Sequence, residues 1–135
     1  MKKISFILLF VFVFCGCSTL KDASQCVAGV STRSLESGKA DSIYQIYPCD
    51  LTECFNTVVA IAEKNKYYVF MKDPIRGLVT VMDVPGQVDT TEVGIFLTEL
   101  SKQQGVRVDL SSRSTPAKRA VAKVLFSELN DLYKK

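Results

Sequence analysis

The sequence has no histidine among its 135 residues. Histidine is the usual general acid or base near neutral pH and the commonest ligand of catalytic zinc, so its absence excludes His-based catalysis and most catalytic zinc sites. The sequence also lacks a Gly-rich phosphate loop, a nucleophile elbow and the ligand spacing of a calcium loop. No pair of carboxylates stands out as a general acid and base. We therefore expect no enzyme activity, no metal site and no bound cofactor.

The N-terminal apolar run is too short to cross a bilayer comfortably. It extends from Ile4 to Phe14, whereas a transmembrane helix needs about 20 apolar residues. Lys2 and Lys3 precede the run and the small residue Gly16 follows it, which is the pattern of a secretory signal. A conventional Ala-x-Ala-like cleavage site is missing. This combination indicates a signal that is processed in another way.

The residues Phe14-Cys15-Gly16-Cys17 resemble the lipobox of bacterial lipoproteins. The resemblance implies that residues 1–16 are a removed signal peptide and that Cys17 carries a diacylglycerol on sulfur and an acyl chain on nitrogen. Several acyl chains hold a protein stably on a membrane, because each buried CH₂ contributes about 0.8 kcal/mol. This covalent lipid is the only added group we expect. The alternative interpretation is a plain signal peptide or a short anchor helix.

Ser18 occupies the position where the inner-membrane retention signal of these lipoproteins has Asp. The resemblance therefore implies the periplasmic face of the outer membrane in a Gram-negative cell, or the outer face of the cytoplasmic membrane in a Gram-positive one. Lys2 and Lys3 are two of 17 basic residues, against 14 acidic ones, so the mature chain would be nearly neutral. Nothing in this charge balance indicates a nucleic-acid partner.

The mature chain is long enough for one domain with a hydrophobic core and too short for two. Residues 17–41 are rich in Ser, Thr, Gly, Lys and Asp, and we predict a lipidated flexible tether there. Residues 42–135 are predicted to form a single α+β domain of order β-α-β-β-β-β-α. Two helices would pack on one face of an antiparallel sheet of four to five strands. The predicted strands are residues 42–47, 67–72, 78–84, 93–100 and 106–112.

Local signals fix both predicted helices. Asp50 is a strong N-cap, with Glu53 completing a capping-box pattern, and Asn65 is a suitable C-terminal stop. The last helix is predicted to start with Thr115 as its cap and Pro116 at the first helical position. In the last strand, apolar and polar residues alternate, which predicts one wet sheet face. Val106, Val108 and Leu110 would point to the core, and Arg107, Asp109 and Ser111 to solvent.

Cys49 and Cys54 occupy the N′ and N4 positions of the first helix, which meet in a hydrophobic staple. The compartment outside the cytoplasmic membrane is oxidising, so the pair closes a disulfide if its Cα atoms lie within about 7 Å. As thiols, the two side chains would pack as small apolar groups. Both alternatives stay open. Cys26 is the third cysteine besides those of the lipobox.

Two further groups have a functional and an ordinary interpretation. Lys118, Arg119 and Lys123, early in the last helix, are either a patch for lipid headgroups or an acidic partner, or a solvated helix face. Five aromatic residues around the first two strands either line a ligand groove or belong to the core, which we favour. They are Tyr44, Tyr47, Tyr67, Tyr68 and Phe70.

The stretch from Asp50 to Val81 resembles a family of small Gram-negative lipoproteins of uncharacterised function. The pattern is an amphipathic helix followed by Tyr67-Tyr68-Val69-Phe70 and Asp73-Pro74-Ile75-Arg76-Gly77-Leu78-Val79. It is also similar to the helix-grip modules of a lipoprotein component of the outer-membrane β-barrel assembly machine. The resemblance implies a non-enzymatic binding or scaffolding module with an envelope protein as partner. The alternative is a carrier that holds a small apolar ligand between helix and sheet.

Overall fold

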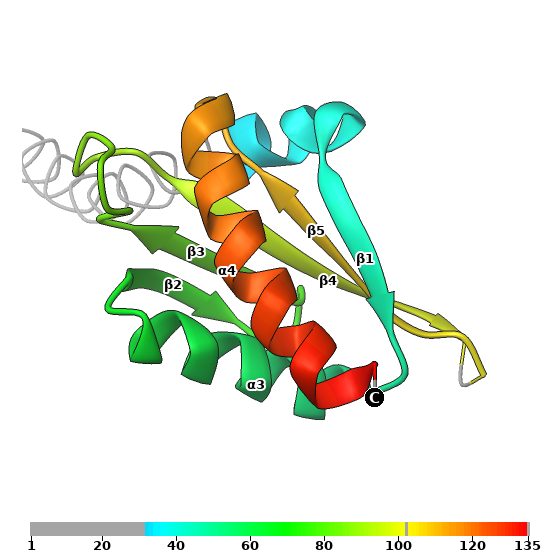
Figure 1. The fold of residues 1–135 in the computed structure, drawn as a ribbon. Helices are drawn as coiled ribbons and strands as arrows, with labels where there is room; N and C mark the ends of the chain where they lie inside the picture. The colour runs from blue at the N-terminus through cyan, green and yellow to red at the C-terminus, as the bar shows by residue number, and fades with distance from the viewer. Residues whose placement is uncertain (1–31, 102, 135) are drawn as a thin grey trace, which may run out of the picture. The chain divides into compact units, whose positions relative to one another are not determined.

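Five strands form one open antiparallel sheet in the order β1-β5-β4-β3-β2 (Figure 1). The strands are β1 (Ile43–Tyr47), β2 (Tyr68–Asp73), β3 (Leu78–Met82), β4 (Val93–Ser101) and β5 (Gly105–Ser111). Helix α3 (Leu51–Lys64) connects β1 to β2, and helix α4 (Thr115–Tyr133) follows β5. The computed structural model describes residues 32–101 and 103–134, so the predicted signal peptide, Cys17 and Cys26 lie outside the described residues.

The predicted α+β class, the five antiparallel strands and the order of strands and long helices are confirmed. The structure adds helical residues ahead of β1, at positions 32–37 and in the 3₁₀ helix η1 (Gly38–Asp41). Those from Ser34 onward belong to the same unit as the sheet, which therefore begins at Ser34 and not at the predicted boundary of residue 42. The last eight residues of the predicted tether are therefore part of the fold.

The helix ends follow the local sequence, with one correction. The Asp50 side chain caps α3 by accepting a hydrogen bond from the Glu53 backbone N–H at 2.7 Å, and Asn65 is its C-cap, both as predicted. The prediction of Thr115 as the cap of α4 is wrong, because the Ser114 hydroxyl accepts the bond from the Ala117 backbone N–H at 3.3 Å. Thr115 is the first residue of the helix.

Helices α3 and α4 pack on the same face of the sheet, and Figure 1 shows α4 crossing in front of the strands. Val106, Val108 and Leu110 of β5 point into the core between helices and sheet, as predicted, and each is fully buried. The core also takes fully buried side chains from both helices and from β1, β3 and β4, whereas β2 contributes the partly buried Val69. Among the largest are Tyr47, Val58, Ile95, Leu125 and Leu129.

The opposite face of the sheet is not uniformly wet, which corrects the prediction for β5. Asp109 and Ser111 are buried because residues 34–41 pack over this face. Leu35 is only 4% exposed and packs with Leu78 and Phe96, while the Ser111 hydroxyl donates to the Leu35 carbonyl at 2.6 Å. Arg107 alone of the three predicted outward residues stays partly exposed. A short segment ahead of β1 thus forms a second, small core.

Candidate functional site

Lys118 does not belong to an exposed basic patch. Its side chain is 4% exposed, and its ammonium donates hydrogen bonds to the backbone oxygen of Asp41 and, at 3.0 Å, to Asp41 Oδ2. The Asp41 carboxylate itself is 93% exposed. The lysine therefore ties the first turn of α4 to Asp41, two residues ahead of β1, so its charge is unavailable to a partner. Burial of its long stem among apolar neighbours makes this a structural contact.

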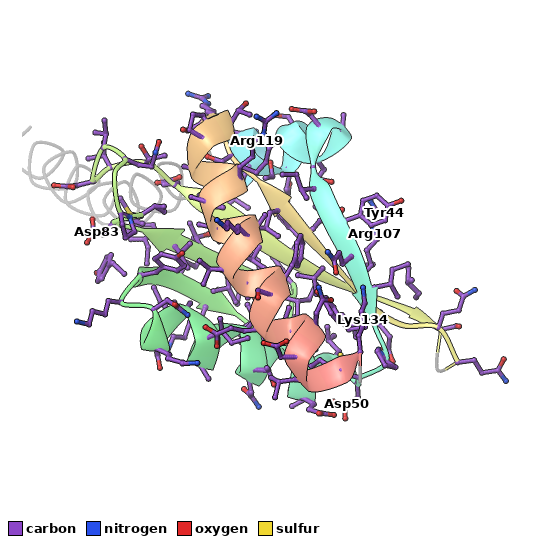
Figure 2. All side chains as sticks on the ribbon, viewed as in Figure 1. Tyr44, Asp50, Asp83, Arg107, Arg119 and Lys134 are labelled. Atoms are coloured by element: carbon purple, nitrogen blue, oxygen red, sulfur yellow. The ribbon has the colours of Figure 1, made fainter. Side chains whose placement is uncertain are left out.

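Arg119 and Lys123 remain exposed and lie together along an open groove of about 500 Å³ between α4 and β1. Figure 2 marks Arg119 near the start of α4. The two predicted patch residues are thus brought together, and the third is turned away from them. The full set of lining residues is Ile43, Gln45, Arg119, Ala122, Lys123, Phe126, Ser127 and Asn130.

Contacts at the two ends of α4 hold it alongside β1, and the helix and the strand run in the same direction. At the start, Lys118 binds Asp41 just ahead of β1. At the far end, the Tyr47 hydroxyl lies 3.3 Å from Asn130 Oδ1, and Lys134 Nζ donates to Gln45 Oε1 at 3.0 Å. Between these contacts, side chains of both elements line the groove. The helical spacing of its α4 residues (i, i+3, i+4, i+7) was the signal that could have predicted this surface.

Cys49 and Cys54 meet at the start of α3, as their N′ and N4 positions predict, and both are free thiols in the structure. The Cys49 thiol donates a hydrogen bond to the Tyr47 backbone oxygen at 3.8 Å, and Cys54 is buried. Desolvation by burial raises the pKa of both thiols above the usual value, most strongly for Cys54. A raised pKa disfavours the thiolate, so neither side chain has the character of a catalytic nucleophile. The disulfide and the apolar staple both stay predictions.

A second hollow, of about 460 Å³, lies beside this cysteine pair and is acidic. Its lining residues are Pro48, Cys49, Asp50, Glu53, Glu99, Ser101, Gln103 and Gly105. The Glu53 carboxylate accepts a hydrogen bond from the Tyr133 hydroxyl at 3.0 Å, which joins the ends of the two helices. Across residues 32–101 and 103–134, no three His, Cys, Asp or Glu side chains are arranged to hold a metal ion.

The five predicted aromatic residues divide between core and surface. Tyr47 and Tyr67 are buried, whereas Tyr68, Phe70 and, at 52%, Tyr44 are exposed. The guanidinium carbon of Arg107 lies 3.9 Å from the centre of the Tyr44 ring, on the sheet face away from the helices. Arg107 also donates three hydrogen bonds to the Asp109 carboxylate, at 2.8, 2.9 and 3.1 Å. Figure 2 marks Tyr44 and Arg107 on the flank formed by β1.

In the part of the chain that the structure describes, no helix is both long and apolar enough to span a bilayer. No protein family model, no curated protein and no solved structure matches the chain.

Proposed function

We propose that this protein is a lipid-anchored periplasmic lipoprotein whose folded unit is a non-enzymatic binding or scaffolding module of the cell envelope. The observation that carries the anchor is the string Phe14-Cys15-Gly16-Cys17 after a basic start and a short apolar run. Ser18, in place of Asp, supports sorting to the outer membrane, with the outer face of the cytoplasmic membrane as the alternative. The implied partners are the membrane itself and an envelope protein.

The filled interior of the domain favours binding at its surface over storage of a ligand inside. The region between the helices and the sheet is occupied by fully buried side chains such as Tyr47, Ile95 and Leu125. A carrier of a small apolar ligand needs an enclosed apolar cavity. The two hollows described above are instead open to solvent and carry charged residues on their walls. These surfaces suit contacts with another macromolecule better than storage of a lipid-like molecule.

Mass spectrometry of the membrane-extracted protein tests the anchor. We expect a mature N-terminus at Cys17 that carries acyl chains, and we expect Cys17→Ala to release or mislocalise the protein. The matched control is Cys15→Ala, which changes the neighbouring cysteine of the same string and should leave acylation intact. Recovery of a soluble, unmodified wild-type protein would overturn the anchor.

Site-specific photo-cross-linking in intact cells tests the binding module. A photoreactive residue at Ser127, inside the groove, should give a reproducible adduct with one envelope protein. The control position is Asn56, which is exposed on α3 outside both hollows. Equal labelling patterns from the two positions would contradict a specific partner at the groove.

A further inference from the structure

The two edges of the sheet differ in how they are protected against pairing with another strand. An edge strand has unpaired backbone N–H and C=O groups, and proteins usually block it with charges, proline or a bulge. The β2 edge has such protection, with a register shift between Val69 and Met71 and the charged residues Lys72 and Asp73 at its end. The β1 edge, Ile43–Tyr47, has no charged residue, no proline and a regular register with β5.

The charged side chains that line the groove beside β1 are both basic. Arg119 and Lys123 stand on the wall of the groove, and Lys134 reaches Gln45 at its far end. No carboxylate lies within ion-pair distance of these three cations in the described part of the chain, although five other pairs form there. A row of unneutralised cations next to an open edge favours a partner that brings negative charge.

We propose that β1 binds an extended acidic segment of a partner protein by strand addition. Side chains alternate between the two faces of a strand, so every second side chain of an added strand would point into the groove beside α4. Side chains two residues apart on a strand are separated by about 6.8 Å, and Arg119 and Lys123, one helical turn apart, by about 6 Å along the axis. Acidic residues at alternate positions therefore match the two cations.

The opposite side of the added strand would meet a different surface. Tyr44 and Ile46 of β1 are exposed on the sheet face away from the helices. The alternate residues of the segment would pack beside these two side chains, which favours apolar or β-branched residues there. The partner segment is thus an extended stretch in which acidic and apolar residues alternate.

A second copy of this chain is a poorer occupant of the same edge. Pairing of β1 with β1 across a two-fold axis would bring the basic groove walls of both copies to one interface. Like charges in such an arrangement repel, and nothing in β1 itself supplies a carboxylate.

Fluorescence anisotropy with the purified full chain tests the charge requirement. The probe is a short labelled peptide in which Glu alternates with Val and Thr. We expect saturable binding, and a loss of affinity of about tenfold or more when Arg119→Glu and Lys123→Glu are combined. The matched control combines Lys66→Glu and Arg76→Glu, two exposed cations outside the groove, and should change the affinity by less than about twofold. Absence of binding by the wild type, or equal losses in both double variants, would overturn the proposal.

Two N-methylated forms of the probe test the backbone pairing without changing the protein. One form is methylated on the odd amides and the other on the even amides, so only one of them blocks the edge that pairs with β1. We expect that form to lose binding and the other to keep it. Equal affinity of the two forms would mean adsorption by charge alone and would refute strand addition. A dimer that persists at saturating peptide in sedimentation experiments would assign the edge to a second copy instead.

The inference rests on the proposal that the domain is a binding module, but the two can fail separately. Peptide titration uses the purified chain and does not depend on the lipid at Cys17. A failed titration therefore leaves the acylation result intact, and absence of acylation leaves the peptide result intact.

Discussion

Replacement of Leu35 by alanine measures how firmly residues 34–41 are docked on the sheet. Leu35 is 4% exposed and packs with Leu78, Phe96 and the partly buried Met71. The change removes three carbon atoms, each worth about 0.8 kcal/mol on burial, and leaves a cavity behind. Because the cluster is small and near the surface, we expect the free energy of unfolding to fall by about 2–3 kcal/mol, at the lower end of the usual range for Leu→Ala.

Urea unfolding followed by circular dichroism gives this value, and thermal unfolding should show a Tm lowered by about 10–20 °C for a unit of this size. Ile75→Ala is the control, because Ile75 is 95% exposed at the tip of the β2–β3 hairpin and should change stability by less than about 0.5 kcal/mol. If Leu35→Ala is as mild as Ile75→Ala, residues 34–41 are a tether and the docking argument fails.

Three further changes test local features of the fold. Lys66 follows α3 with a backbone φ of 62°, a conformation in which a residue with a side chain is strained. Lys66→Gly should therefore raise the free energy of unfolding by about 0.5–1 kcal/mol in urea titrations. An unchanged unfolding midpoint would contradict this strain. Ser114→Ala should cost about 0.5–2 kcal/mol through loss of the α4 cap, whereas Thr115→Ala should cost less than about 0.5 kcal/mol in the same assay; equal costs would refute the corrected cap. Burial raises the pKa of Cys49 and Cys54, so under reducing conditions the unfolded chain loses these protons first, and the free energy of unfolding should decline as the pH rises above about 9, the usual thiol pKa. A double Cys→Ala variant should show a weaker decline, and identical pH profiles would contradict the raised pKa values.

Features with a local cause could be predicted from the sequence. The N-cap of α3 needs only Asp50 and the residues that follow it, and the inward positions of β5 follow from the alternation of side chains along a strand. The docking of residues 34–41 could not be predicted in this way. Leu35 is the one large apolar residue between Ser34 and Asp41, and its partner Ser111 is 76 residues away in the chain.

The burial of Lys118 could have been predicted from its position on α4, although its charge alone suggests an exposed side chain. Counted from Lys118, the buried residues Val121, Ala122, Leu125 and Leu129 follow at i+3, i+4, i+7 and i+11, so the lysine lies on the buried stripe of α4. The helical pattern does not identify the hydrogen-bond acceptor of Lys118, because Asp41 lies 77 residues earlier in the chain. A charged residue on an apolar stripe therefore predicts a distant partner without identifying it.

If Cys17 carries the proposed lipid, the docking of residues 34–41 also limits how far the proposed binding groove can lie from the membrane. The predicted tether of residues 17–41 would span at most about 85 Å fully extended, at roughly 3.4 Å per residue. A tether that ends where the folded unit begins, at Ser34, would span at most about 58 Å. The contacts of Leu35 with the sheet, and of Lys118 with Asp41, thus remove roughly a third of the reach. A shorter tether would raise the effective concentration of the groove near the membrane surface, because the same anchor would then confine the domain to a smaller volume. With the proposed lipid at Cys17, the small second core would therefore influence position as well as stability, because it would confine the β1 edge to partners that lie close to the bilayer.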